Sequence, residues 1–147
     1  MAFTNSTPKI ILLEDVGAVM LKERSSSDVI TPGNFVTLNS SNEFSVQITP
    51  GGAEPKMVAL QNDIVGQTID DTYAVGDNVI AAAVQPGDVV YTFVAAGEAA
   101  LAIGAIVEYN DEGGVRAVTS GTPVGIITEA VDNSGGSSAA RAKVQII

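Results

Sequence analysis

Short hydrophobic runs, separated by clusters of turn-forming residues, make up most of this chain. Residues 44–48 alternate between apolar and polar side chains, and another apolar run, residues 35–38, precedes them across the polar cluster 39–42. Alternation with a period of two is typical of a strand with one buried face, and a polar cluster between two such runs is typical of a hairpin. We therefore predict an antiparallel hairpin over residues 35–48.

The C-terminal part of the chain shows the same pattern. Residues 106–109 and 115–118 flank a turn that contains Gly113 and Gly114, which predicts a second hairpin. Residues 140–147 alternate, so that the small and aliphatic side chains face one way and the basic and polar ones the other. Helical patterns are scarce: residues 95–101 are the best candidate, and they read equally well as a loop. The chain is therefore predicted to be all-β.

Recurring Gly-Asp and Pro-Gly turns precede many of the predicted strands. The clearest are Gly76-Asp77 and Pro86-Gly87-Asp88, with Pro32-Gly33-Asn34 as a looser copy; Gly104 opens a unit without the acid. Glycine permits a positive φ, proline presets the corner before it, and Asp or Asn can bond the backbone beyond the turn. The spacing is too irregular for a solenoid. It favours a small β-barrel or β-sandwich of short antiparallel strands.

The N-terminal region differs from this body. Residues 1–9 are polar and contain Pro8, which predicts an extended arm. Residues 9–15 contain the apolar run 10–13, which is too short for periodicity to separate a strand from a short helix. We predict an arm with a first strand or short helix over residues 1–25 and a β-barrel or β-sandwich body over residues 26–147. The length of 147 residues suits this organisation.

Composition narrows the choice of partners. The chain has 17 acidic and 7 basic residues, a net charge of −10 and no basic run. Nucleic acid and anionic membranes attract Lys and Arg patches, so neither is an expected partner. Charged residues are only 16% of the chain, so the surface needs either another source of solubility or a partner that covers part of it. With no Trp, the core is expected to be aliphatic.

A catalytic site is not expected. The chain has no His and no Cys, and no serine lies in a Gly-x-Ser-x-Gly motif. Asp70-Asp71 could be a carboxylate pair, but neighbours along a strand point to opposite faces, so a solvated turn before Tyr73 is favoured. We therefore predict no enzyme and no cofactor.

A calcium site is also disfavoured. Carboxylates that could supply oxygen ligands occur at Asp63, Asp70, Asp71, Asp77 and Asp88. No stretch has the spacing of an EF-hand loop, and turn formation is the favoured explanation of these residues. No metal ligands are predicted. The N-terminus lacks a basic region followed by a long apolar stretch, so synthesis in the cytoplasm is expected.

The order of these turn-and-strand motifs resembles the capsid decoration (cement) proteins of tailed bacteriophages. In that family's pattern an acidic residue stands where this chain has Gln61. The stretches that carry the resemblance are residues 29–38, 57–63, 66–77, 86–98 and 123–131, followed by the closing strand.

The resemblance implies a role in the virion. Members of that family dock on the outer surface of the assembled capsid and are frequently homotrimers with an N-terminal arm. The implied partners are the major capsid protein and further copies of the chain. The expected inter-subunit or capsid contacts are in the arm, although Phe3 is equally compatible with a terminal residue that makes no contact: Phe3, Lys9, Ile10, Ile11, Leu12 and Leu13.

Two other classes of function stay open. One is a head-fibre or adhesin-like β domain that binds carbohydrate or a host-surface receptor. Sugar sites usually present aromatic side chains, and this chain offers only Tyr73, Tyr91 and Tyr109 besides its phenylalanines. The other is an enzyme accessory domain or a hydrolase with an unusual carboxylate site, which a metal-dependent activity lost on changing Asp70 or Asp77 would support.

Overall fold

The protein is all-β, as predicted, in a computed structural model that describes residues 8–17 and 19–147. A single short 3-10 turn, η1 (Asp63–Val65), interrupts the strands of this part of the chain. The strands are β1 Leu12–Glu14, β2 Met20–Ser25, β3 Phe35–Leu38, β4 Phe44–Val46, β5 Met57–Ala59, β6 Asn78–Ala83, β7 Val89–Val94, β8 Ile106–Tyr109, β9 Val115–Ala117, β10 Gly125–Ile127 and β11 Ala140–Ile146.

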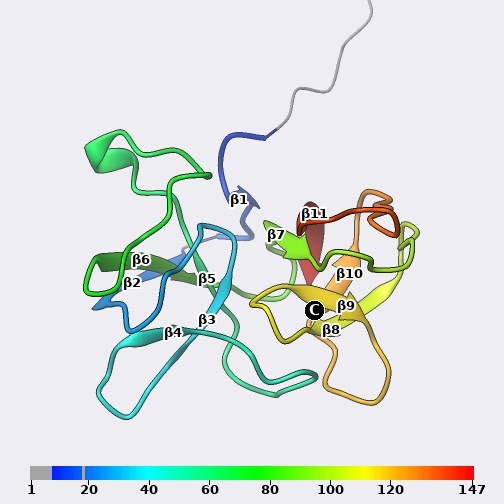
Figure 1. Cartoon of the computed structure of the whole chain (residues 1–147), viewed down its shortest axis with the longest axis horizontal. Helices are drawn as coiled ribbons and strands as arrows, with labels where there is room; N and C mark the ends of the chain where they lie inside the picture. Colours follow the sequence, from blue (N-terminus) through cyan, green and yellow to red (C-terminus); the bar gives the residue numbers. More distant parts are fainter. Residues whose placement is uncertain (1–7, 18) are drawn as a thin grey trace, which may run out of the picture.

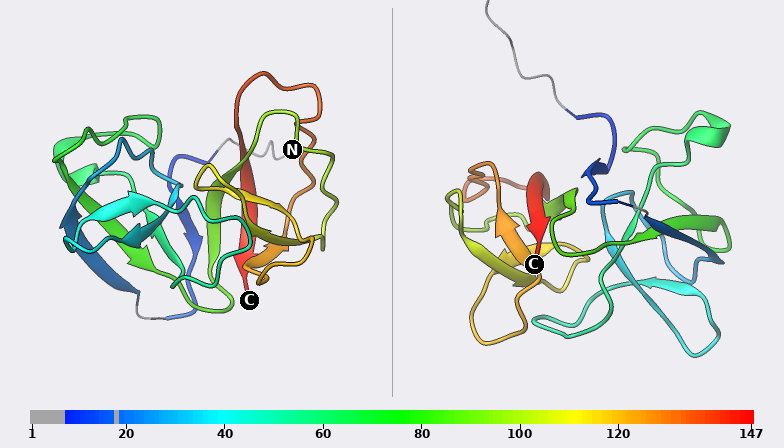
Figure 2. Two further views of the ribbon diagram at one scale, coloured as in Figure 1. Left: turned by 60° about the horizontal axis from the view of Figure 1, so that its bottom comes forward. Right: turned by 180° about the vertical axis from the view of Figure 1, so that it is seen from behind.

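The strands form two small barrels that lie side by side (Figures 1 and 2). In the N-terminal barrel the strand order is β2-β6-β5-β3-β4, and a parallel bridge between Ser26 and Phe44 closes it. In the C-terminal barrel the order is β7-β11-β10-β8-β9, and a parallel pairing of Val94 with Val115 closes it. Strand β1 adds to β7 at the edge of this second barrel.

The two barrels have the same topology. In each, the first strand pairs with the fifth, the fifth with the fourth, the fourth with the second and the second with the third, and a parallel contact joins the third to the first. Isolated bridges also correspond: Ile30 pairs with Tyr73 in one barrel, and Leu101 with Val131 in the other. The chain therefore contains an internal structural repeat, in which each barrel is one copy.

The hairpins of the two barrels share the same side-chain bonds from an asparagine oxygen to the turn. In the N-terminal barrel, the side-chain Oδ1 of Asn39 accepts the main-chain N–H groups of Ser41 and Glu43. In the C-terminal barrel, the Oδ1 of Asn110 accepts the corresponding N–H groups two and four residues further on. The next shared feature is a left-handed residue, Asn42 (φ 61°) in one hairpin and Gly113 (φ 80°) in the other.

The hydrophobic core has two parts. One lies inside the N-terminal barrel and includes Phe44, Tyr73 and Val79. The larger part fills the C-terminal barrel and continues onto Phe35, Val58 and Ala82 of the N-terminal barrel. Because this cluster spans both barrels, the interface between them is core rather than a solvated seam. The core is largely aliphatic, in agreement with the sequence.

The Asp and Asn side chains of the Gly-Asp and Pro-Gly turns were expected to bond the backbone beyond the turn, and the structure shows a different partner. The carboxylate of Asp77 accepts the N–H of Ala74, and that of Asp88 accepts the N–H of Gln85. Asn34 bonds the N–H of Thr31 in the same way. The side chain therefore bonds the residue that begins the turn, three positions earlier, rather than the backbone beyond it. Each turn is closed twice, because the Asp or Asn N–H also donates to the carbonyl of that first residue.

Both N-terminal strands lie within the sheets. β1 pairs with β7 of the C-terminal barrel, and β2 pairs along its whole length with β6 of the N-terminal barrel. The division into residues 1–25 and 26–147 stays a prediction. The alternation predicted for residues 140–147 is confirmed, since Ala142, Val144 and Ile146 are buried. None of the described residues form a helix long and apolar enough to cross a bilayer.

Candidate functional site

Ile11 anchors the described part of the predicted arm directly before β1. Ile11 is 0% exposed and packs in the core shared by the two barrels. Its N–H donates to the Gln61 side chain at 3.2 Å, and its carbonyl accepts the N–H of Tyr91 at 2.8 Å. Ile11 is thus an internal anchor of the arm. Its neighbour Ile10 is exposed.

The other predicted contact residues are placed around this anchor. Lys9 is exposed, and Leu12 and Leu13 are half-buried in β1. Phe3 lies outside the described residues. The contact role of all these residues stays a prediction, but the exposed side chains of Lys9 and Ile10 are available to a partner and that of Ile11 is not.

A shallow depression of about 450 Å³ lies beside the arm. Lys9 is its basic side chain, and the carboxylates of Asp63 and Asp70 face it from the loop that follows β5. The remaining lining residues are Pro8, Gln67, Thr68 and Ile69.

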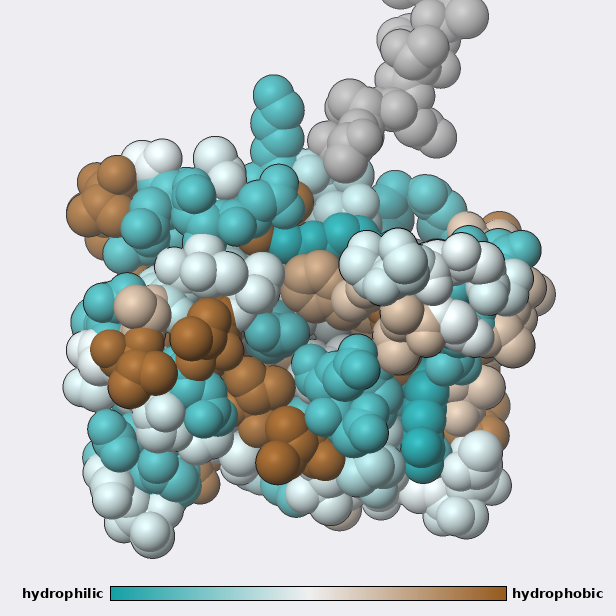
Figure 3. All heavy atoms as spheres, viewed as in Figure 1, coloured by the Kyte–Doolittle hydropathy of each residue, from teal (hydrophilic) through white to brown (hydrophobic). Residues whose placement is uncertain are grey.

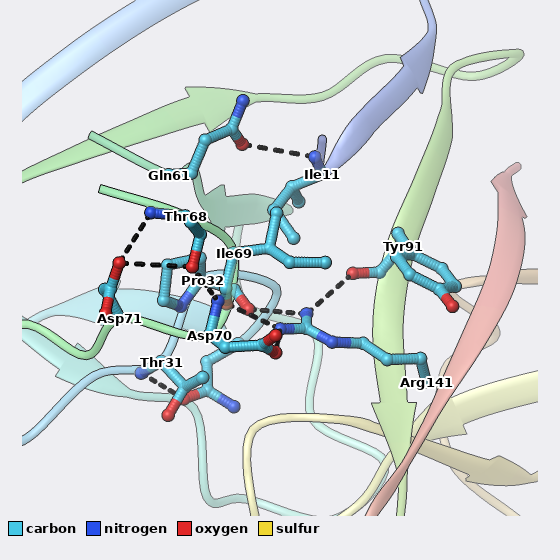
Figure 4. A network of polar contacts seen from close by, with 11 residues as sticks. Ile11, Thr31, Pro32, Gln61, Thr68, Ile69, Asp70, Asp71, Tyr91 and Arg141 are labelled. Carbon is cyan, nitrogen blue, oxygen red and sulfur yellow. Dashed lines mark hydrogen bonds and ion pairs between the residues drawn. The ribbon is translucent and has the colours of Figure 1, made fainter. Parts of the chain in front are cut away.

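Arg141 cross-links the two barrels (Figure 4). It projects from β11, and its guanidinium donates to the carbonyl of Pro32 at 2.6 Å and to that of Ile69 at 2.7 Å. A longer bond of 3.4 Å reaches the carbonyl of Tyr91. The guanidinium also stacks on Phe93, 4.1 Å from the ring centroid. One side chain therefore fixes two loops of the N-terminal barrel against two strands of the C-terminal barrel.

The electrostatics of Arg141 fit a structural role. Burial lowers the pKa of its guanidinium, and the carboxylate of Asp70, 3.6 Å away, works in the opposite direction. Arginine stays charged throughout the accessible pH range despite such a shift. Its donors are used by the chain's own carbonyls, which would otherwise be buried without a partner.

A second depression of about 410 Å³ lies over this cross-link. Asp70 belongs to both depressions and is 86% exposed on its side chain, so its carboxylate stands on the ridge between them. The other residues that line the second depression are Thr31, Asn34, Phe93, Asn110, Glu112, Ser138, Ala139 and Arg141. This ridge beside the arm is the candidate contact surface.

Asp70 and Asp71 have separate partners. The carboxylate of Asp71 accepts both the N–H and the hydroxyl of Thr68, at 2.7 and 3.1 Å, which closes the turn. Asp70 instead lies beside Arg141. The two carboxylates therefore have different neighbours and are not held as a pair.

The other acidic residues weighed as metal ligands also lie in turns. Asp88 is buried, and its two oxygens accept the N–H groups of Val16 and Gln85. Among the described residues, no three acidic side chains lie close enough together to hold a metal ion.

Glu108 is a buried carboxylate that the sequence pattern does not single out. It is held by the Arg116 guanidinium at 2.9 Å, the Thr119 hydroxyl at 2.9 Å and the Gly121 N–H at 2.7 Å. Burial alone raises its pKa, but these hydrogen bonds and the positive charge of Arg116 outweigh burial, so the pKa is lowered. Because its oxygens are occupied, Glu108 ties the loop after β9 to β8 rather than offering a reactive group.

Many apolar side chains are exposed. Figure 3 shows that on one face they gather mainly over the N-terminal barrel. Few charges together with this much exposed apolar surface are typical of proteins with interaction faces. The exposed large apolar residues are Ile10, Val16, Met20, Leu21, Val29, Leu38, Ile48, Ile64, Val65, Val75, Ile103, Ile106, Val118 and Ile147.

The fold also occurs in a bacteriophage protein. One solved structure that matches is the N base of head fiber gp8.5 in bacteriophage phi29, with a TM-score of 0.57 and 10% sequence identity. The match covers 88% of this chain and 95% of that chain. No family model and no curated protein matches the chain. At this identity the likeness establishes a shared fold and no finer relationship.

Proposed function

We propose that this chain is a structural protein of a tailed-bacteriophage head. It binds the outer surface of the assembled capsid and stabilises it as a decoration protein. The observation that carries the proposal is the fold shared over most of its length with the base of a phage head fibre. The order of its turn motifs, which resembles that of capsid decoration proteins, supports the same assignment independently.

The mechanism is preferential binding. A protein that binds the expanded lattice but not the precursor shell or the free subunits stabilises the lattice by mass action. When its free concentration is 100 times the Kd, this linkage contributes about 2.7 kcal/mol for each site. A specific contact of this kind buries about 1,000 Å² or more in total. The chemistry required is an interaction surface alone, which suits a chain whose carboxylates serve turns and loop contacts.

The proposed capsid contact is centred on the arm. Lys9 and Ile10 have exposed side chains directly before the Ile11 anchor, and Asp70 stands on the ridge beside them. A segment that leaves the body at a fixed point can add a strand to a partner's sheet edge, where main-chain hydrogen bonds give affinity. Contact with a neighbouring copy in a homotrimer is the other proposed use of this segment.

A second candidate is favoured by the same comparison. The phi29 protein is a head fibre, and this chain corresponds to its base. On this proposal the chain attaches to the head and positions a receptor-binding or carbohydrate-binding part, without stabilising the lattice. The two candidates share capsid attachment and differ in its effect on capsid stability.

Co-sedimentation tests attachment. The purified chain is mixed with three forms of the major capsid protein of the phage that encodes it: expanded shells lacking the chain, precursor shells and free subunits. We expect saturable co-sedimentation with expanded shells and at least tenfold weaker binding to the other two. The absence of binding to expanded shells would exclude both candidates, and equal binding to precursor shells would exclude the preferential mechanism.

A further inference from the structure

The two barrels contact each other through a hairpin of one and the start of a strand of the other. Because the barrels repeat the same fold, each of these two surfaces has a counterpart on the other barrel, and both counterparts are exposed to solvent. At the centre, the β8–β9 hairpin packs on the start of β3, and the Phe35 N–H donates to the Gly113 carbonyl at 2.7 Å. We name residues 109–114 and their counterparts 38–43 the hairpin faces. We name residues 32–35 and their counterparts 103–106 the strand faces.

Burial separates the central surfaces from their counterparts. In the central strand face, residues 32–35 are all buried, whereas in its counterpart Ile103 is 70% and Ile106 is 46% exposed. In the central hairpin face Tyr109 is 1% exposed, whereas in its counterpart Leu38 is 37% exposed and Asn42 is also exposed. Each chain thus has one hairpin face and one strand face left open.

The surroundings of the glycine in each strand face show the same difference in burial. Gly33 and Gly104 have similar φ angles, 98° and 87°, because they occupy the same turn position. A Cβ built on Gly33 would lie 2.7 Å from the Tyr91 carbonyl oxygen of the other barrel. A Cβ on Gly104 would meet nothing within 4 Å. The open strand face therefore has the same backbone conformation as the central one, but no hairpin of the described chain packs on it.

The side chains at the open faces are complementary. In the central contact, Phe35 and Tyr109 pack edge to face with ring centroids 5.1 Å apart. Their counterparts are Ile106 and Leu38, two apolar side chains exposed on different barrels. An aromatic pair at the centre therefore corresponds to an aliphatic pair at the open faces, which a second copy would bring together.

The sizes of the side chains at the two open faces also support a contact between them. At the centre, a Cβ on Gly113 would lie 2.6 Å from Val46 and 3.1 Å from the Asn34 side chain, so only glycine fits. The open hairpin face has the larger Asn42 in this place. The residues that would oppose it are the counterparts of Val46 and Asn34, namely Ala117 and Ala105. A larger residue on the hairpin is thus matched by a smaller residue on the strand face, Ala105, and by another beside it, Ala117.

We propose that copies of this chain associate head to tail, by placing the open hairpin face of one copy on the open strand face of the next. Leu38 packs on Ile106, and the Ile106 N–H donates to the carbonyl of Asn42, as Phe35 does to Gly113 within the chain. A contact between two different faces leaves one of each open, so it propagates into a closed ring or a filament. This inference holds for the purified chain and goes beyond capsid binding.

Sedimentation velocity over a range of concentrations tests the contact with the full chain. The variants are Leu38→Lys and Ile106→Lys, and the matched control is Ile64→Lys, which changes an 85% exposed residue outside both faces. Each face variant is expected to weaken self-association at least tenfold, and the control should associate like the parent chain. Circular dichroism checks that each variant is folded, and serine replaces lysine at either position if it is not.

Mixing the two face variants tests the direction of the contact. L38K keeps an intact strand face and I106K an intact hairpin face, so an equimolar mixture should form a one-to-one dimer that grows no further. A parent chain that stays monomeric at every concentration would overturn the proposal, and so would variants that associate normally. Variants that stay monomeric when mixed would indicate a symmetric contact instead and would also overturn it.

Discussion

Phe35 and Tyr109 meet edge to face across the two barrels, with their ring centroids 5.1 Å apart and their planes at 65°. Phe35 begins β3 of the N-terminal barrel, and Tyr109 ends β8 of the C-terminal barrel. Both side chains are fully buried, and burial raises the pKa of the Tyr109 phenol. This pair makes the interface between the barrels part of the core.

Truncating Tyr109 should therefore destabilise the whole chain. The change Tyr109→Ala removes a large buried ring and its contact with Phe35, and we expect a loss of about 3–5 kcal/mol in the free energy of unfolding. Leu38→Ala is the matched control, because Leu38 occupies the same position in the other barrel and is partly exposed. Its cost should be below about 1 kcal/mol. Urea unfolding followed by circular dichroism measures both, and similar losses would contradict a core role for the central contact.

Arg141 is expected to hold the barrels together by bonding carbonyls. Arg141→Met keeps much of the apolar stem but leaves the carbonyls of Pro32 and Ile69 without their donor. We expect a loss of about 2–4 kcal/mol in unfolding free energy. The control is Lys143→Met on the same strand, since Lys143 pairs with an exposed Glu129 and such pairs contribute about 0–1 kcal/mol. A thermal melt in which both variants unfold at the same temperature would argue against the cross-link.

Glu108 should make stability depend on pH in the acid range. Its pKa in the folded chain lies below the ordinary value of 4.5, so its contribution is present above that value and is lost as the pH falls through the folded pKa. Glu108→Gln should cost about 1–3 kcal/mol at pH 7, because an amide replaces an acceptor of three donors. The difference between the variant and the parent chain should shrink at pH 3. A difference that stays constant between pH 7 and pH 3 would contradict this assignment.

Changes at the exposed arm residues should affect capsid binding, whereas a change at the buried Ile11 should affect stability. A double variant, Lys9→Glu with Ile10→Asp, changes two exposed side chains and is expected to weaken capsid binding at least tenfold without changing the unfolding midpoint. Ile11→Ala is the opposite case, since it empties a core position and should cost about 2–5 kcal/mol in unfolding free energy. Co-sedimentation and urea unfolding are measured on both variants. Unchanged binding by the double variant would remove the arm from the proposed contact.

Much of the local structure could be predicted from the sequence. The hairpins over β3–β4 and β8–β9 follow from period-two alternation around polar turns, and the closing strand β11 follows from the same rule. Gly76 and Gly87 adopt the positive φ that their turns require. These features depend on neighbours in the chain, and local patterns report them reliably.

The internal repeat could not be predicted in this way. The corresponding positions share backbone conformation and hydrogen bonds but few side chains: Asn39 and Asn110 are identical, whereas Phe35 corresponds to Ile106 and Gly113 to Asn42. The side chains differ because one copy of each surface is buried at the centre and the other is exposed. At these positions the residue type follows whether the side chain is buried between the barrels or exposed to solvent, although the backbone conformation is the same.

The cross-barrel contacts were equally invisible in the sequence. Arg141 looks like one of the outward polar residues of an alternating strand, and its acceptors are main-chain carbonyls, which carry no sequence signal. Ile11 lies in an apolar run assigned to contact with other molecules, and the structure buries it within the chain itself. In both cases the second barrel covers a face that a single sheet would expose to solvent.

The most direct measurement of the proposed function is the thermal disruption of expanded capsids that lack this chain, followed by light scattering as the chain is added. A decoration protein should raise the disruption temperature with concentration, up to a plateau at full occupancy. The arm variant K9E/I10D should require at least tenfold more protein for the same shift. Saturating attachment with no change in disruption temperature would contradict the decoration role and favour the fibre base.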